Sequence, residues 1–101
     1  MKIWVDDIRP APEDMVWCKT TDQVKNNIDL CLMAHIPIEL IDLDHDAGDY
    51  NKSLYGGDYI NILNWLEENN INIPIHIHSM NPVGVQNMRA IIEHNGWTEI
   101  F

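Results

Sequence analysis

The chain has few basic residues and few cysteines, and it contains no long hydrophobic run. Six Lys and Arg stand against 16 Asp and Glu, so the formal charge is −10 over 101 residues. This balance argues against binding along a long nucleic acid, which depends on many Lys and Arg contacts to phosphate. No segment approaches the roughly 20 apolar residues of a membrane span, and Met1-Lys2 leads straight into a strand-like segment, so we expect no signal peptide. A small ligand is therefore a better candidate partner than a polymer or a bilayer.

The two cysteines lack the spacing of a metal site. Cys18 falls in a predicted strand and Cys31 in a predicted helix. We interpret both as reduced core residues of a cytoplasmic protein. The chain has no internal repeat, low-complexity segment or linker, so residues 1–101 are expected to form a single domain.

Strand-length apolar segments alternate with segments of helical periodicity. We expect strands near 2–5, 15–18, 38–43 and 74–79, helices near 20–34, 58–69 and 81–95, and a short final strand near 97–101. This alternation predicts a largely parallel sheet with helices on both faces. Pro10 and Pro12 exclude a full helix after the first strand. One face should therefore be thinly covered, which would suit a homodimer.

Capping patterns mark the helix starts. Thr20 with Gln23 fits a capping box, and Asn81 followed by Pro82 is a strong N-terminal signal. Asp58 is expected to cap the middle helix. The buried face of the first predicted helix consists of Val24, Ile28, Cys31 and Leu32, and that of the second of Tyr59, Ile62, Leu63 and Leu66.

The third predicted strand ends in the consecutive ionisable residues Asp44, His45 and Asp46. Ligands bind at the carboxyl ends of strands in open α/β sheets, although such a strand can also simply end in a polar loop. Three strand ends should converge there and bring together Asp6, Asp7, Asp44, His45, Asp46, His78, Ser79 and Asn81. The connection 47–57 that follows is either a lid over this site or a disordered surface loop.

Three segments resemble the receiver-domain superfamily: Val5-Asp6-Asp7, Leu43-Asp44, and Ser79 after the fourth strand. The finer pattern resembles the cyclic-phosphate processing receiver domain, through Asp6-Asp7-Ile8-Arg9-Pro10, Leu43-Asp44-His45-Asp46-Ala47-Gly48, and His78-Ser79-Met80-Asn81-Pro82-Val83-Gly84 with Asn87-Met88. The resemblance implies a flavodoxin-like three-layer sandwich with strand order 2-1-3-4(-5) and a degenerate first helix. It also implies action on cyclic phosphates in bacterial and phage conflict or RNA repair.

One departure from signalling receivers concerns their essential lysine. Those domains place a Lys after the fifth strand, where it pairs with the phosphoryl group. The last Lys here is Lys52, so no residue of the second half can take that role.

The resemblance assigns a divalent cation, Mg²⁺ or Mn²⁺, to the carboxylates of Asp6, Asp7 and Asp44. Crowded carboxylates must share protons or bind a cation, and oxygen ligands suit these metals. The alternative is that Arg9 alone neutralises the cluster.

Phosphate is expected at the start of the third helix, where free N–H groups point outward. Candidate phosphate-binding residues are Arg9, Ser79, Asn81, Gly84 and Asn87, and candidate catalytic residues are His45, His78, Asp44 and Asp46. The two histidines could serve as base and acid on a phosphodiester, although His78 could instead be a core histidine. We interpret His76 as buried support, and Asp42 needs a partner that the sequence does not identify.

These patterns lead to one principal hypothesis and two alternatives. The first is a phosphoesterase, possibly assisted by metal, that opens a cyclic phosphate on a nucleotide or nucleotide-derived signal. The second is a non-catalytic module that sequesters such a ligand or docks on a partner protein. The third is an atypical phosphoacceptor receiver, which the missing Lys argues against.

Overall fold

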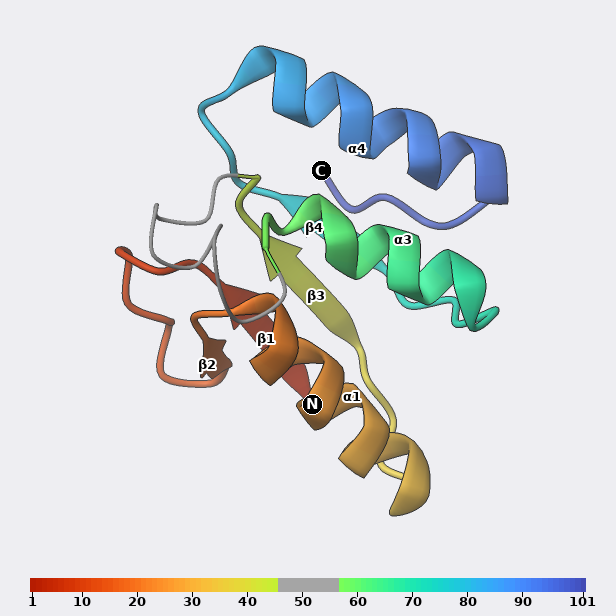
Figure 1. The fold of residues 1–101 in the computed structure, drawn as a ribbon. Coiled ribbons are helices and arrows are strands. Elements are labelled where there is room, and N and C mark those ends of the chain that lie inside the picture. The colour runs from red at the N-terminus through yellow and green to blue at the C-terminus, as the bar shows by residue number, and fades with distance from the viewer. Residues whose placement is uncertain (46–56) are drawn as a thin grey trace.

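A computed structural model describes residues 1–45 and 57–101 of the chain. The strands are β1 (Lys2–Val5), β2 (Val16–Cys18), β3 (Leu40–Leu43) and β4 (Ile75–Ile77), and the helices are α1 (Thr21–Met33), α3 (Ile60–Glu68) and α4 (Pro82–Asn95). Figure 1 shows α1 and α3 in front of the sheet, with α4 alongside β4. Asp46 and nearly all of the predicted 47–57 loop lie outside the described residues.

The four strands form one parallel sheet in the order β2-β1-β3-β4. This order is the one predicted, and the receiver-like α/β fold is confirmed. Residues 8–15 contain turns but no helix, as Pro10 and Pro12 require. The predicted final strand is reduced to a single parallel bridge between Ile75 and Glu99.

The helix caps follow local chemistry at two of the three predicted starts. Thr20 Oγ1 accepts a hydrogen bond from Gln23 N at 3.1 Å, and Gln23 Oε1 accepts one from Lys19 N at 2.7 Å. Asn81 Oδ1 accepts from the N–H of the third residue of α4 at 3.1 Å. The prediction for Asp58 is wrong, because α3 begins after Tyr59, whose side chain makes no capping bond.

The described helices all pack on one face of the sheet. Their buried residues form one core with the inward residues of the strands, and the cluster comprises Ile3, Val5, Cys18, Val24, Ile28, Ile41, Leu43, Tyr59, Ile62, Leu63, Leu66, Ile73, Ile75, Met88 and Ile92. The expected helices on both faces are therefore not found in 1–45 and 57–101. The chain crosses from β2 over β1 to β3 and then on to β4, always in one direction, and right-handed crossovers then place the intervening helices on one side. Leu32, expected in the core, is 49% exposed.

The opposite face carries a row of side chains across the sheet. Trp17, Trp4, Asp42 and His76 are consecutive partners in the parallel register. His76 is not buried support, because it is half-buried and its Nδ1 lies 2.7 Å from the carbonyl of Ile100. The homodimer through this helix-free face stays a prediction.

Two sequence predictions concern the interior and the membrane. Cys18 and Cys31 are both free and buried, and burial raises the pKa of the Cys18 thiol to about 11. No helix in the described part of the chain is long and apolar enough to cross a membrane.

Candidate functional site

Backbone hydrogen bonds hold the carboxyl ends of the strands side by side. Asp6 N donates to Cys18 O at 3.2 Å, and Asp44 N donates to Val5 O at 3.0 Å. His78 N donates to Leu43 O at 3.0 Å. Each bond continues a strand pair by one residue, so the polar residues that follow the strands must emerge at the same edge.

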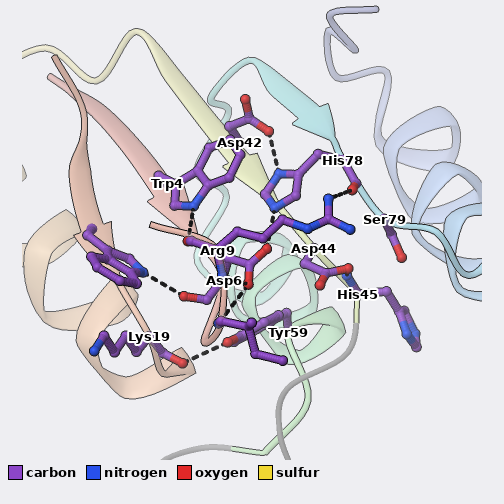
Figure 2. A network of polar contacts seen from close by, with 12 residues as sticks. Trp4, Asp6, Arg9, Lys19, Asp42, Asp44, His45, Tyr59, His78 and Ser79 are labelled. Carbon is purple, nitrogen blue, oxygen red and sulfur yellow. Dashed lines mark hydrogen bonds and ion pairs between the residues drawn. The ribbon is translucent and has the colours of Figure 1, made fainter. Parts of the chain in front are cut away.

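His78 is the centre of a buried polar cluster at this edge. Its Nδ1 lies 2.6 Å from Asp42 Oδ1, and its Nε2 lies 3.0 Å from Asp6 Oδ2. The side chain is only 9% exposed, and its ring stacks on the indole of Trp4 with centroids 4.0 Å apart and planes 3° from parallel. Asp42 thereby gains the partner that the sequence left open (Figure 2).

The two carboxylate partners favour the protonated form of this imidazole. Both ring nitrogens can donate at once only in the imidazolium. Burial lowers the pKa of His78, but the hydrogen bonds that the ring donates to Asp42 and Asp6, with the negative charges of these groups, outweigh burial, so the pKa lies above its ordinary value. With both nitrogens occupied, His78 is placed to neutralise two acids rather than to exchange a proton with a ligand.

Asp6 is fully engaged by protein donors. Its Oδ1 accepts from Ile8 N and Arg9 N, both at 2.9 Å, and its Oδ2 faces His78. Burial raises the pKa of Asp6, but the two backbone N–H groups and His78 together outweigh burial, so the net pKa lies below its ordinary value. The carboxylate is therefore ionised and is compensated within the protein.

This engagement bears on the predicted metal site. In residues 1–45 and 57–101 no group of three His, Cys, Asp or Glu is arranged to hold a metal ion. Asp7 is half-buried beside Asp6, and Asp44 Oδ1 accepts from His45 N at 2.7 Å. As arranged, the three carboxylates do not fit a divalent cation unless Asp6 releases His78. Metal binding by Asp6, Asp7 and Asp44 stays a prediction.

Two tryptophans that the sequence analysis did not select shape the loop after β1. Trp17 Nε1 donates to Asp6 O at 2.7 Å, and Trp4 Nε1 donates to Arg9 O at 2.9 Å. Strand alternation placed both on the face opposite the core, and that signal could have linked them to this end of β1. Together they fix the backbone on either side of Ile8.

Arg9 reaches from this loop to the end of β4. Its Nη1 donates to His78 O at 3.5 Å, and the residue is exposed. Figure 2 shows its side chain extending toward that carbonyl, with Asp44 and Ser79 near the guanidinium group. A planar guanidinium at the solvent side of the cluster is a ready partner for a phosphate group.

The start of α4 supplies neutral donors beside Arg9. Asn81 N donates to Ser79 Oγ at 3.1 Å, and Pro82 has no N–H. Gly84 N is used by Asn81 Oδ1, whereas Val83 N meets no acceptor within 1–45 and 57–101. The helix dipole adds a partial positive charge at this point.

His45 lies directly against the first turn of α4. A Cβ atom built on Gly84 would fall 2.6 Å from both Cδ2 and Nδ1 of His45, so the ring occupies the space of the missing side chain. Asn87, one turn further along α4, is on its exposed side. The structure thus brings His45, Ser79, Asn81, Gly84 and Arg9 to one edge of the sheet. The predicted site residue Asp46 is not among the described residues.

A parallel 2-1-3-4 sheet with acidic residues at the carboxyl ends of β1 and β3 defines a receiver-like domain. The family model of the cyclic-phosphate processing receiver domain matches residues 1–94. The chain belongs to this family. A comparison of the chain with curated proteins found no match, and a comparison with solved structures found none.

Proposed function

We propose that the domain binds a nucleotide-derived cyclic phosphate at the carboxyl edge of its sheet and opens the ring by hydrolysis. The placement of His45 on the first turn of α4, at the same edge as Ser79, Asn81 and Arg9, carries the proposal. It joins one group able to move a proton to several groups able to bind an anion.

Phosphate affinity would come from Arg9, Ser79 and the start of α4. The guanidinium of Arg9 gives a charge-assisted contact, and the N–H of Val83 with the Ser79 hydroxyl gives neutral ones. These positive and neutral groups are needed because the protein as a whole is strongly acidic. Internal pairing of Asp6 and Asp42 with His78 removes two nearby negative charges from the field that the ligand meets.

His45 would act as the acid–base group. In the hydrolysis, water attacks phosphorus and gives a proton to the imidazole, and the P–O bond to one ribose oxygen breaks. The imidazolium then returns a proton to that oxygen, so atoms and charge balance. His78 would support the site electrostatically instead of exchanging protons, since both of its nitrogens are bonded to carboxylates.

Exposed apolar side chains beside the phosphate donors favour a nucleotide over a bare sugar phosphate. Met80 is 82% exposed, Val83 65% and Ile8 80%. Each one adjoins a residue of the proposed phosphate site in sequence. The two faces of a nucleobase are flat and apolar, and such side chains can cover them.

Hydrolysis of a panel of compounds tests the proposal. The panel contains 2′,3′-cyclic nucleotides, 3′,5′-cyclic nucleotides and cyclic dinucleotides, with products separated by chromatography. His45→Ala should lower turnover by about 10²–10⁴-fold with affinity retained. Arg9→Ala should weaken binding by about 1.5–3 kcal/mol. Lys25→Ala on α1 removes the same charge away from this edge and should change neither quantity. Turnover that is unaffected in His45→Ala would contradict the assigned role.

A binding module without hydrolysis is the second candidate. The observation in its favour is that His78 has no free ring nitrogen, so a two-histidine acid–base mechanism lacks one partner. Calorimetry with the same panel separates the two functions. Arg9-dependent binding of a compound that is never hydrolysed would favour sequestration.

A further inference from the structure

Gly84 is an unexpected residue near the start of a helix. It is the third residue of α4, after Pro82 and Val83, and it is buried. Glycine in a helix is less favourable than alanine because it loses more conformational freedom on folding. Its φ is not in the left-handed region that would require glycine, so the backbone conformation does not explain it.

The space that a side chain would fill is occupied by His45. A Cβ on Gly84 would lie 2.6 Å from Cδ2 and Nδ1 of that ring and closer still to Cγ. Cγ joins the ring to the chain through one carbon, and the backbone N of His45 is held by Asp44 Oδ1 at 2.7 Å. The ring therefore cannot make room by a small bend of a flexible tail. Any side chain at position 84 must displace it.

Direct phosphate binding does not account for the glycine. The Gly84 N–H already donates to Asn81 Oδ1 at 3.1 Å, and any other residue except proline would supply the same N–H. What only glycine supplies is the absence of Cβ.

We propose that Gly84 is a positioning residue, which seats the His45 imidazole on the first turn of α4 by leaving the place of its own side chain empty. Asp44 holds the backbone end of His45 and Gly84 holds the ring end. That this position of the His45 ring serves catalysis rests on the function proposed above, but the contact between the ring and Gly84 can be tested without any measurement of activity.

Thermal unfolding of a double-mutant cycle tests the contact. Gly84→Ala alone should lower Tm, because the new methyl group and the ring compete for one space. In the His45→Ala background the same change should raise Tm by about 4 °C, since alanine is the better helix former and the ring is gone. Gln86→Ala, at an exposed position of α4, serves as the matched control and should give the same small shift in both backgrounds.

Nuclear magnetic resonance gives a direct readout of ring position. Nuclear Overhauser contacts between the His45 ring protons and the Gly84 α protons should be present in the wild type. In Gly84→Ala, no such contact should link the ring to position 84, while the signals of α3 stay in place. A role of Gly84 in helix stability alone would leave the His45 ring signals unmoved.

Kinetics add the functional part. Gly84→Ala should lower kcat by about 10²–10⁴-fold, the range of acid–base catalysis, with KM little changed. The double variant His45→Ala/Gly84→Ala should have the kcat of His45→Ala, because without the imidazole the methyl group at position 84 has no ring to displace.

Each outcome decides one part of the inference. A Tm change of the same sign and size in both backgrounds, including failure of Gly84→Ala to fold in both, would contradict the proposed contact between Gly84 and the His45 ring. Tm changes of opposite sign in the two backgrounds, with no hydrolysis by the wild type or any variant, would support the contact between Gly84 and the His45 ring and reject the catalytic function.

Discussion

Replacement of His78 by glutamine should be the most destabilising single change at the carboxyl edge of the sheet. The imidazolium lies between Asp42 Oδ1 at 2.6 Å and Asp6 Oδ2 at 3.0 Å, and its side chain is 9% exposed. Glutamine removes the positive charge and leaves two carboxylates close together in a largely buried cluster.

The expected loss follows from the two charge-assisted bonds. Breaking a buried ion pair by removing one partner costs about 3–5 kcal/mol, and loss of the stacking on Trp4 adds to this by about 0.5–1.5 kcal/mol. With a urea m-value of about 1.5 kcal/mol/M, the unfolding midpoint should fall by about 2–4 M. His76→Gln, two residues earlier on β4, loses only the contact to Ile100 O and should shift the midpoint much less.

The pH dependence of this loss has a defined sign. The pKa of His78 is raised in the folded state above its ordinary 6.5, so its contribution is complete below that value and disappears as pH rises through the folded-state pKa. The pKa of Asp6 is lowered below its ordinary 3.8, so its contribution is complete above that value and disappears on acidification through the folded-state pKa. The gap between wild type and His78→Gln should therefore be widest between 3.8 and 6.5 and should narrow in alkaline buffer.

Urea unfolding followed by circular dichroism at about pH 5.5 and about pH 9.5 measures this gap. Equal midpoints for wild type and His78→Gln at the lower pH would refute the reasoning. So would a gap that is unchanged at the higher pH, because the stabilisation would then not come from the imidazolium.

Three further predictions concern the metal, the phosphoacceptor and the sheet face. Millimolar Mn²⁺ should raise Tm if the cation binds the carboxylates, and Asp44→Asn should abolish this rise. His78→Gln should enlarge the rise, because Asp6 then loses its imidazole partner and can bind the cation. A Tm that Mn²⁺ leaves unchanged in the wild type and in both variants would count against the metal site. Acetyl phosphate should leave no lasting aspartyl phosphate on Asp44, because no Lys follows Lys52; a stable adduct in the intact mass would favour the phosphoacceptor receiver. If the helix-free face forms a homodimer, Trp17→Glu, at a residue 38% exposed on that face, should shift sedimentation from dimer to monomer, whereas a wild type that is monomeric at high concentration would exclude this dimer.

Local features of this protein could be predicted from sequence because they depend on neighbouring residues. The Thr20 and Asn81 caps and the missing helix after β1 each follow from one or two side chains and the backbone next to them. The convergence of acidic residues also followed, because parallel strands end at a common edge. Asp58 failed as a cap because the start of α3 lies one residue later than its local signal indicated.

Tertiary structure alone decided how the residues at that edge are paired. Asp42 and Asp6 meet His78 across 36 and 72 residues, and only the strand register determines that both carboxylates reach one ring. The contact of the His45 ring with Gly84 joins the end of β3 to the first turn of α4, and no periodicity in the sequence encodes it. The sequence by itself determined which chemical groups reach the edge, whereas packing determined which of them neutralise one another and which remain available to a ligand.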